Sequence, residues 1–146
     1  MSEVLDRRGI EALIPHRDPF LLIDRITELE PGVRAVGEHT FTGKEWYQPG
    51  HFPGEPIVPG VILVESCAQV ATVMAMSLPE YRDGLGLFAG IEEMRFKRMV
   101  TPGDTGRFEA VMDKFRRGYA RVKVAAYVGD ELACEGTILA MFRPNK

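Results

Sequence analysis

Cysteine, tryptophan and histidine are scarce in this sequence, which has 2, 1 and 3 of them among 146 residues. Two cysteines cannot build a disulfide scaffold, and neither Cys67 nor Cys134 lies in a CxxC or other metal-binding spacing. We therefore expect two reduced thiols, a cytoplasmic location, and no metal site or organic cofactor. No repeat, low-complexity tract or linker divides the chain, so residues 1–146 are expected to form a single domain.

Long hydrophobic segments are also rare. Residues 1–10 contain four charged side chains and no apolar stretch, which argues against a signal peptide. Only the segment from Val61 to Leu78 approaches the length of a membrane span, and it carries the carboxyl group of Glu65. We therefore expect a buried helix and no membrane insertion.

The net charge is small, at −3, and its distribution is uneven. Residues 1–90 hold 7 basic and 13 acidic residues, whereas residues 91–146 hold 11 basic and 8 acidic ones. This balance excludes a bulk nucleic-acid binder. The C-terminal part can still offer a local basic surface to an acidic partner.

The hydrophobic pattern predicts two strands, one long helix, and then further strands. Alternating apolar residues predict antiparallel strands with one buried face, and a helix that is apolar on nearly every side must be wrapped by other elements. The simplest α+β architecture is therefore a curved antiparallel sheet around a single helix. The expected elements are a short helix at 8–14, strands at 20–29 and 33–41, the helix at 61–78, and strands around Met94 and Phe96, 108–112, 122–128 and 137–142.

Two ionisable residues stand out as candidates for acid–base chemistry. His51 lies in a loop dense in glycine and proline, and Glu65 is the only charged residue of the apolar helix. An apolar setting raises the pKa of a carboxyl group and keeps an imidazole neutral, which suits an acid and a base. The alternatives are that His51 is structural or solvated, and that Glu65 merely forms a hydrogen bond with Gln69. That bond could also orient the carboxyl group.

The start of the helix is a third candidate element. Gly60 has no side chain, and the free N–H groups near it point outward with the positive end of the helix dipole. Such groups could hold a carbonyl oxygen as it gains negative charge.

Three segments carry a family resemblance. Residues 51–61 (HFPGEPIVPGV), followed by Glu65 and Gln69, resemble the signature of the β-hydroxyacyl-acyl carrier protein dehydratases of type II fatty acid synthesis. Residues 14–24 (IPHRDPFLLID) resemble that family's N-terminal segment, and residues 95–98 with 102–104 resemble a later strand and turn. Met99 and the pair Trp46–Tyr47 depart from the family's usual residues but leave the catalytic string intact.

The resemblance implies the hot-dog fold and a homodimer, often a trimer of dimers, in which His51 of one subunit faces Glu65 of the other. It also implies the dehydration of a (3R)-3-hydroxyacyl thioester to a trans-2-enoyl thioester. His51 would be the base, Glu65 the acid, the Gly60 N–H the oxyanion donor and Gln69 a supporting residue. Glutamate rather than aspartate at position 65 favours the dehydratase-only branch.

The substrate carrier implied by the resemblance is an acidic acyl carrier protein. Its docking needs a positive patch, for which Arg95, Lys97 and Arg98 are candidates, although ordinary solvated strand faces explain them as well. We expect His16 and His39 to be structural. A hot-dog acyl thioesterase and a non-catalytic acyl-binding subunit of a synthase remain as alternatives.

Overall fold

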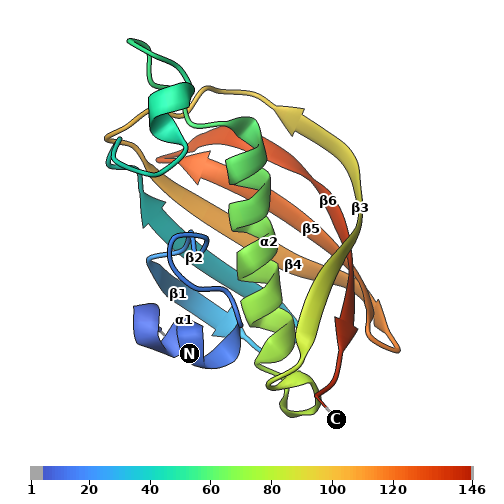
Figure 1. Ribbon diagram of the computed structural model, residues 1–146. Helices are drawn as coiled ribbons and strands as arrows, with labels where there is room; N and C mark the ends of the chain where they lie inside the picture. The colour runs from blue at the N-terminus through green and yellow to red at the C-terminus, as the bar shows by residue number, and fades with distance from the viewer. Residues whose placement is uncertain (1–4, 146) are drawn as a thin grey trace.

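The computed structural model describes residues 5–145 and contains one sheet and one long helix (Figure 1). The helices are α1 (Arg7–Leu13) and α2 (Gly60–Met76), with short 3-10 turns at Gln48–Gly50 and Pro79–Tyr81. The strands are β1 (Arg25–Glu30), β2 (Arg34–Thr40), β3 (Leu85–Phe96), β4 (Thr105–Arg116), β5 (Tyr119–Val128) and β6 (Glu131–Arg143).

The six strands form one sheet in the order β1-β2-β4-β5-β6-β3, and every neighbouring pair is antiparallel. The sheet curves around α2, which crosses its concave face (Figure 1). The two strands before the helix and the four after it confirm the predicted α+β architecture, and the arrangement is the hot-dog fold.

Helix α2 is the centre of the hydrophobic core. Pro59 is the N-cap residue and favours a helix start. The first N–H groups of a helix have no acceptor within it, and proline has no N–H to leave unpaired there. Most of its residues are buried, including Cys67, Val70 and Met74 at 0% exposure. The helix predicted at 61–78 is therefore confirmed, with Gly60 and Met76 as its ends. No helix within residues 5–145 has both the length and the apolarity needed to span a membrane.

The expected strand at 20–29 is only partly correct, because β1 begins at Arg25. Leu21 and Ile23 are buried against the core, but their segment is not part of the sheet. The N–H of Leu22 instead donates to the side chain of Gln69 on α2 at 2.8 Å. A side-chain partner has replaced a strand partner here, which hydropathy alone does not predict.

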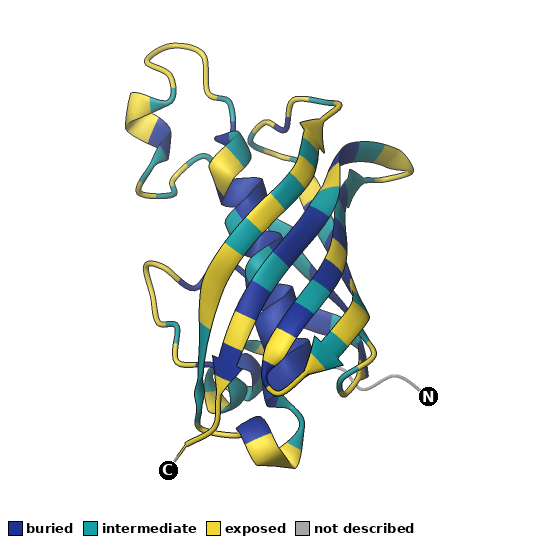
Figure 2. Ribbon diagram, turned by 90° about the vertical axis from the view of Figure 1, so that its right-hand side faces the viewer, coloured by how far each residue is buried: buried dark blue, intermediate teal, exposed yellow. Residues whose placement is uncertain are grey.

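The inward alternation is clear in the central strands and fails in β3. Phe108 and Ala110 of β4 and Val122 of β5 are fully buried, as predicted. Phe96 of β3 was expected on a buried face, yet it is 52% exposed. Figure 2 looks onto the side of the sheet that ends in β3 and shows long exposed stretches along this strand.

The two edges of the sheet differ. At the β1 edge, α1 packs beside a short strand, and Leu5 pairs with Ile26 through two 2.9 Å backbone hydrogen bonds. At the β3 edge, 12 residues run with no strand beyond them in the described chain. The exposed apolar side chains of this edge strand, which we call the β3 strip, are Leu87, Phe88, Ile91 and Phe96.

Candidate active site

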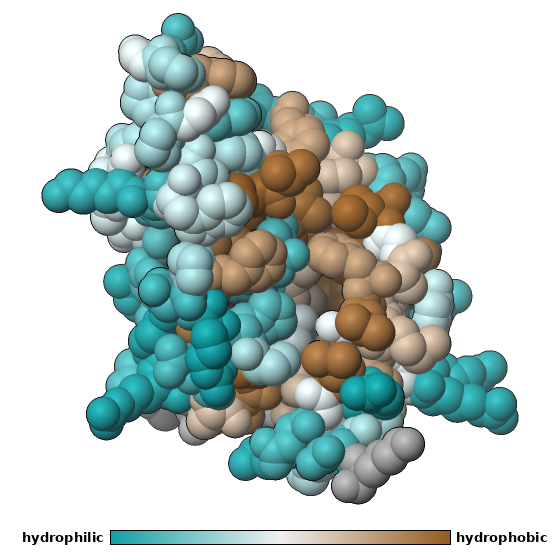
Figure 3. All heavy atoms as spheres, viewed as in Figure 1, coloured by the Kyte–Doolittle hydropathy of each residue, from teal (hydrophilic) through white to brown (hydrophobic). Residues whose placement is uncertain are grey.

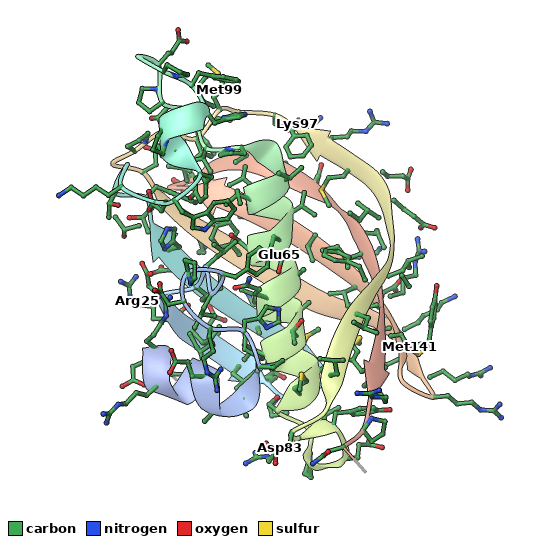
Figure 4. The ribbon with its side chains drawn as sticks, viewed as in Figure 1. Arg25, Glu65, Asp83, Lys97, Met99 and Met141 are labelled. Atoms are coloured by element: carbon green, nitrogen blue, oxygen red, sulfur yellow. The ribbon has the colours of Figure 1, made fainter. Side chains whose placement is uncertain are left out.

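Glu65 lies on α2, near the middle of the view in Figure 4. Its side chain is 19% exposed, and its Oε2 atom accepts a 3.0 Å hydrogen bond from Nε2 of Gln69. Burial raises the pKa of the Glu65 carboxyl above its usual value, and the Gln69 bond offsets only part of this effect. The group is thus biased toward the protonated form, as expected for an acid.

Gln69 is completely buried, and every polar atom of its amide is used. Its Oε1 accepts from the Leu22 N–H at 2.8 Å, and its Nε2 donates to the Phe20 carbonyl at 2.8 Å as well as to Glu65. If the amide were flipped, its NH2 group would face the Leu22 N–H and its oxygen would face the Phe20 carbonyl, and neither pair can form a hydrogen bond. The amide orientation is therefore fixed, and Gln69 can only present an N–H to Glu65. The hydrogen bond considered as an alternative to function exists, and it positions the carboxyl group.

Glu65 forms part of the wall of a cavity of about 250 Å³. The rest of the wall comes from α2, β3, β6 and the segment before β1, and most of it is apolar. Figure 3 shows hydrophobic side chains gathered over α2 and β3, whereas the opposite side of the same view is mostly hydrophilic. An elongated apolar group could therefore lie beside a protonated carboxyl group. The other lining residues are His16, Phe20, Ala68, Ala71, Thr72, Gly86, Leu87, Phe88, Ile138, Ala140 and Phe142.

Sequence reasoning missed His16 as a site residue. It was expected to be structural, yet it lines the Glu65 cavity, and its Nε2 lies 3.9 Å from Oε2 of Glu65. The available signal was its position within residues 14–24, the second segment of the family resemblance.

His51 lies in the loop that precedes α2. Its Nδ1 is 2.8 Å from the Ile57 carbonyl oxygen, and its ring stacks on Phe52 at a centroid distance of 3.9 Å. Because a carbonyl oxygen can only accept, Nδ1 carries the hydrogen and Nε2 of a neutral ring keeps its lone pair. His51 does not line the Glu65 cavity, so a single chain does not bring the expected base and acid together.

Gly60 begins α2, and no side chain caps the helix start. The ring of Phe96 packs over it so closely that a Cβ atom on residue 60 would lie 2.9 Å from Cε1 of Phe96. A side chain at residue 60 would therefore force the Phe96 ring or the helix start to shift. In the first turn, the Ile62 N–H donates to the Pro59 carbonyl at 2.9 Å, whereas the Gly60 N–H has no backbone acceptor among the described residues.

The three candidate docking residues do not form a single free cluster. Arg95 and Lys97 are exposed, and Lys97 projects outward beyond the end of β3 (Figure 4). Arg98 is half-buried and lies 3.8 Å from Asp104 and 3.7 Å from Glu131.

His39 has the structural environment expected for it. Its ring nitrogens lie 2.9 Å from Asp24 and 3.1 Å from Glu45, and both carboxylates also accept backbone hydrogen bonds. Those contacts tie the loop after β2 to the sheet. In residues 5–145, no group of three or more histidine, cysteine or acidic side chains is arranged to hold a metal ion.

Comparison with known proteins shows which family the chain resembles. A family model described as the FabA-like domain matches residues 14–137. Proteins named 3-hydroxyacyl-[acyl-carrier-protein] dehydratase FabZ are similar over nearly the whole chain. The protein from Chloroflexus aggregans is 54% identical over 144 residues, covering 98% of this chain and 100% of that one. The protein from Moorella thermoacetica is 48% identical, covering 92% and 94%.

Solved structures support the fold. A chain of the dehydratase heterocomplex ApeI:P from Xenorhabdus doucetiae has a TM-score of 0.80 at 16% identity, covering 94% of this chain and 91% of that one. At this identity the likeness concerns the fold alone, while the family model and the FabZ proteins carry the family assignment. On that match over residues 14–137 and on those identities, the chain belongs to the FabA-like family.

Proposed function

We propose that this chain dehydrates a (3R)-3-hydroxyacyl thioester on acyl carrier protein to the trans-2-enoyl thioester, in fatty acid biosynthesis. The observation that carries the proposal is the carboxyl group of Glu65, which Gln69 holds on the wall of an apolar cavity with a raised pKa. The names of the FabZ relatives agree with it.

In this proposal, His51 is the general base. Its Nδ1–H donates to Ile57, so Nε2 is free to remove a proton from the carbon next to the thioester carbonyl. The carbonyl oxygen gains negative charge as that proton leaves. The N–H of Gly60, at the positive end of the α2 dipole, stabilises this charge.

Glu65 is the general acid. The electrons of the broken C–H bond form the double bond, the bond between the β-carbon and oxygen breaks, and the hydroxyl leaves as water with the Glu65 proton. His51 then carries one extra proton and Glu65 lacks one, so a proton passing between them through solvent restores both groups. These steps need no redox cofactor, because the α-carbon is formally oxidised by one unit and the β-carbon is reduced by one unit, so the reaction has no net change in oxidation state.

A second copy of the chain is the proposed source of the missing half of the site. The unpartnered β3 edge and the apolar β3 strip suit pairing between two copies, since an open strand edge offers unused backbone hydrogen-bonding groups. Pairing there would let His51 of one subunit reach Glu65 of the other. The assembly could remain a homodimer or form a trimer of dimers.

An acidic carrier protein is the proposed partner, acting in the cytoplasm, where Cys67 and Cys134 would stay reduced as buried free thiols. Arg95 and Lys97 are exposed cations that could meet its acidic surface, with Arg98 beside them. These contacts would steer association, so salt should weaken them.

A product assay with 3-hydroxyacyl carrier proteins of short and long chain length tests the function. Enoyl product supports the proposal and also reports the preferred chain length. Free carrier thiol without enoyl product would identify a thioesterase, and binding without any product would identify an acyl-binding subunit. Either of the last two results would overturn the proposal.

A further inference from the structure

A second imidazole, that of His16, lies beside the proposed acid. His16 belongs to the segment between α1 and β1, and its side chain is 21% exposed on the wall of the Glu65 cavity. Its Nε2 faces Oε2 of Glu65 at 3.9 Å. Nε2 of Gln69 donates to that same oxygen at 3.0 Å. Two nitrogen atoms from distant parts of the chain thus converge on one of the two carboxyl oxygens.

The surroundings of His16 decide which of its nitrogens carries the hydrogen. Nδ1 is buried and has no hydrogen-bond partner among the described residues. Burial, together with the neighbouring Arg17 guanidinium, lowers the pKa of His16, so the ring is neutral near pH 7. Unpaired buried N–H groups are rarer in folded proteins than under-satisfied acceptors, which indicates that a buried N–H without an acceptor costs more free energy than a buried lone pair. The hydrogen therefore belongs on Nε2, the atom that faces Glu65.

We propose that His16 is a positioning residue for Glu65: its Nε2–H and the Gln69 amide both direct Oε2 to accept, so that the proton to be donated stays on Oε1. This inference rests on the proposed function. The present 3.9 Å separation exceeds a hydrogen bond, and catalytic contacts commonly shorten when substrate binds. As Glu65 gives up its proton, its growing negative charge strengthens the attraction of both N–H groups.

Few other charges face this carboxyl group within the described chain. The walls that β3, β6 and the neighbouring turns of α2 contribute are uncharged. The Arg17 guanidinium is turned away and donates to the carbonyls of Glu11, Ile14 and His16. In the proposed dimer, the partner copy would add the imidazole of its own His51. His16 and Gln69 are therefore the groups through which one chain controls its own acid.

The test compares His16→Leu with His16→Gln in the full-length protein, using the 3-hydroxyacyl carrier protein assay from about pH 5 to 10. Leucine fills the space without a donor, whereas glutamine keeps an N–H near the position of Nε2. We expect His16→Leu to lower kcat about tenfold with little change in KM. We also expect the alkaline limb of the kcat–pH profile to move to higher pH, because the Glu65 carboxylate loses a hydrogen-bond donor and its pKa rises. His16→Gln should recover most of the rate and return the limb to its original position.

Equal kcat values and equal alkaline limbs for wild type and His16→Leu would overturn the inference. If circular dichroism shows that His16→Leu does not fold, His16→Asn replaces it, because its amide ends short of Glu65 and the same comparison with His16→Gln applies. Glu65→Gln separates the two proposals. Full activity of that variant would contradict the proposed function, whereas an inactive Glu65→Gln beside an unaffected His16→Leu would contradict the role of His16 alone.

Discussion

The acid and base halves of the proposed site are built differently. Glu65 lies on a buried helix, and Gln69, which orients it, is itself held by the backbone of Phe20 and Leu22. His51 lies in a loop where residues 52–56 are all exposed. One hydrogen bond to Ile57 and stacking on an exposed Phe52 hold its ring.

This difference shows which half a single chain can complete. The environment of Glu65 depends on contacts within one subunit, so an isolated chain already has a raised acid pKa and an apolar cavity. The surroundings of His51 are left open in the single chain. In the proposed dimer, the base half depends on assembly, and the variants below separate the two halves, starting with the largest expected effect.

Removing either half should nearly abolish dehydration. We expect His51→Ala and Glu65→Gln each to lower kcat at least about a hundredfold. If the site is shared between subunits, dissociating the two inactive variants and mixing them should restore about a quarter of the wild-type activity, because half of the dimers are mixed and each mixed dimer has one intact site of two. No recovery, despite subunit exchange verified by mass spectrometry, would indicate that each site forms within one chain.

Disrupting the proposed pairing at the β3 edge should take His51 of the partner copy away from the site and leave the surroundings of Glu65 unchanged. Ile91→Asp places a charge in the β3 strip, and we expect a monomer by sedimentation and a loss of activity of more than about tenfold. Val33→Asp is the matched control, since Val33 is 52% exposed and Ile91 is 51% exposed. A dimeric, active Ile91→Asp would exclude this edge as the interface.

A methyl group at the helix start should perturb the site less. In Gly60→Ala, the new Cβ meets the Phe96 ring at 2.9 Å, so the ring or the helix start must shift. We expect kcat/KM to fall about tenfold, with partial recovery in the double variant Gly60→Ala with Phe96→Leu. Gly50→Ala is the control, because a Cβ at residue 50 meets nothing within 4 Å.

The smallest effect concerns stability and pH. Because the folded-state pKa of Glu65 is raised, folding is favoured below the ordinary carboxyl pKa, and this contribution is lost as the pH rises toward the folded-state value. The difference in Tm between Glu65→Gln and wild type should therefore shift in favour of the variant between about pH 4 and pH 8. Thermal unfolding followed by circular dichroism measures it, and a pH-independent difference would contradict the raised pKa.

The sequence predicted the parts that depend on local pattern and missed those that depend on distant contacts. Helix α2 and the inward residues of β4 and β5 follow from hydrophobic periodicity. The exposure of Phe96 does not, since alternation cannot tell whether the apolar face of an edge strand meets the core or a partner. Likewise, nothing local to residues 20–24 shows that Gln69 would take the N–H of Leu22.

The place of His16 beside Glu65 was missed for the same reason. The two residues meet because the Gln69 amide ties the segment before β1 to the helix, and no spacing rule links them. His51 and Glu65 were recognised as candidates by residue type and setting. Their expected placement in different subunits came from the family resemblance alone, because residue types and spacing do not show which subunit supplies a group.

The difference between the two edges of the sheet also limits how many copies of the chain can join by strand pairing. The β1 edge is obstructed by α1 and the Leu5 bridge, so within residues 5–145 only the β3 edge is free to add a strand. If two copies join through that edge, as proposed, each uses its β3 side, and the combined sheet ends on both sides in an obstructed β1 strand. In the proposed dimer, strand addition would therefore stop after one pairing, which would protect a chain with an exposed apolar strand from polymerising into fibres.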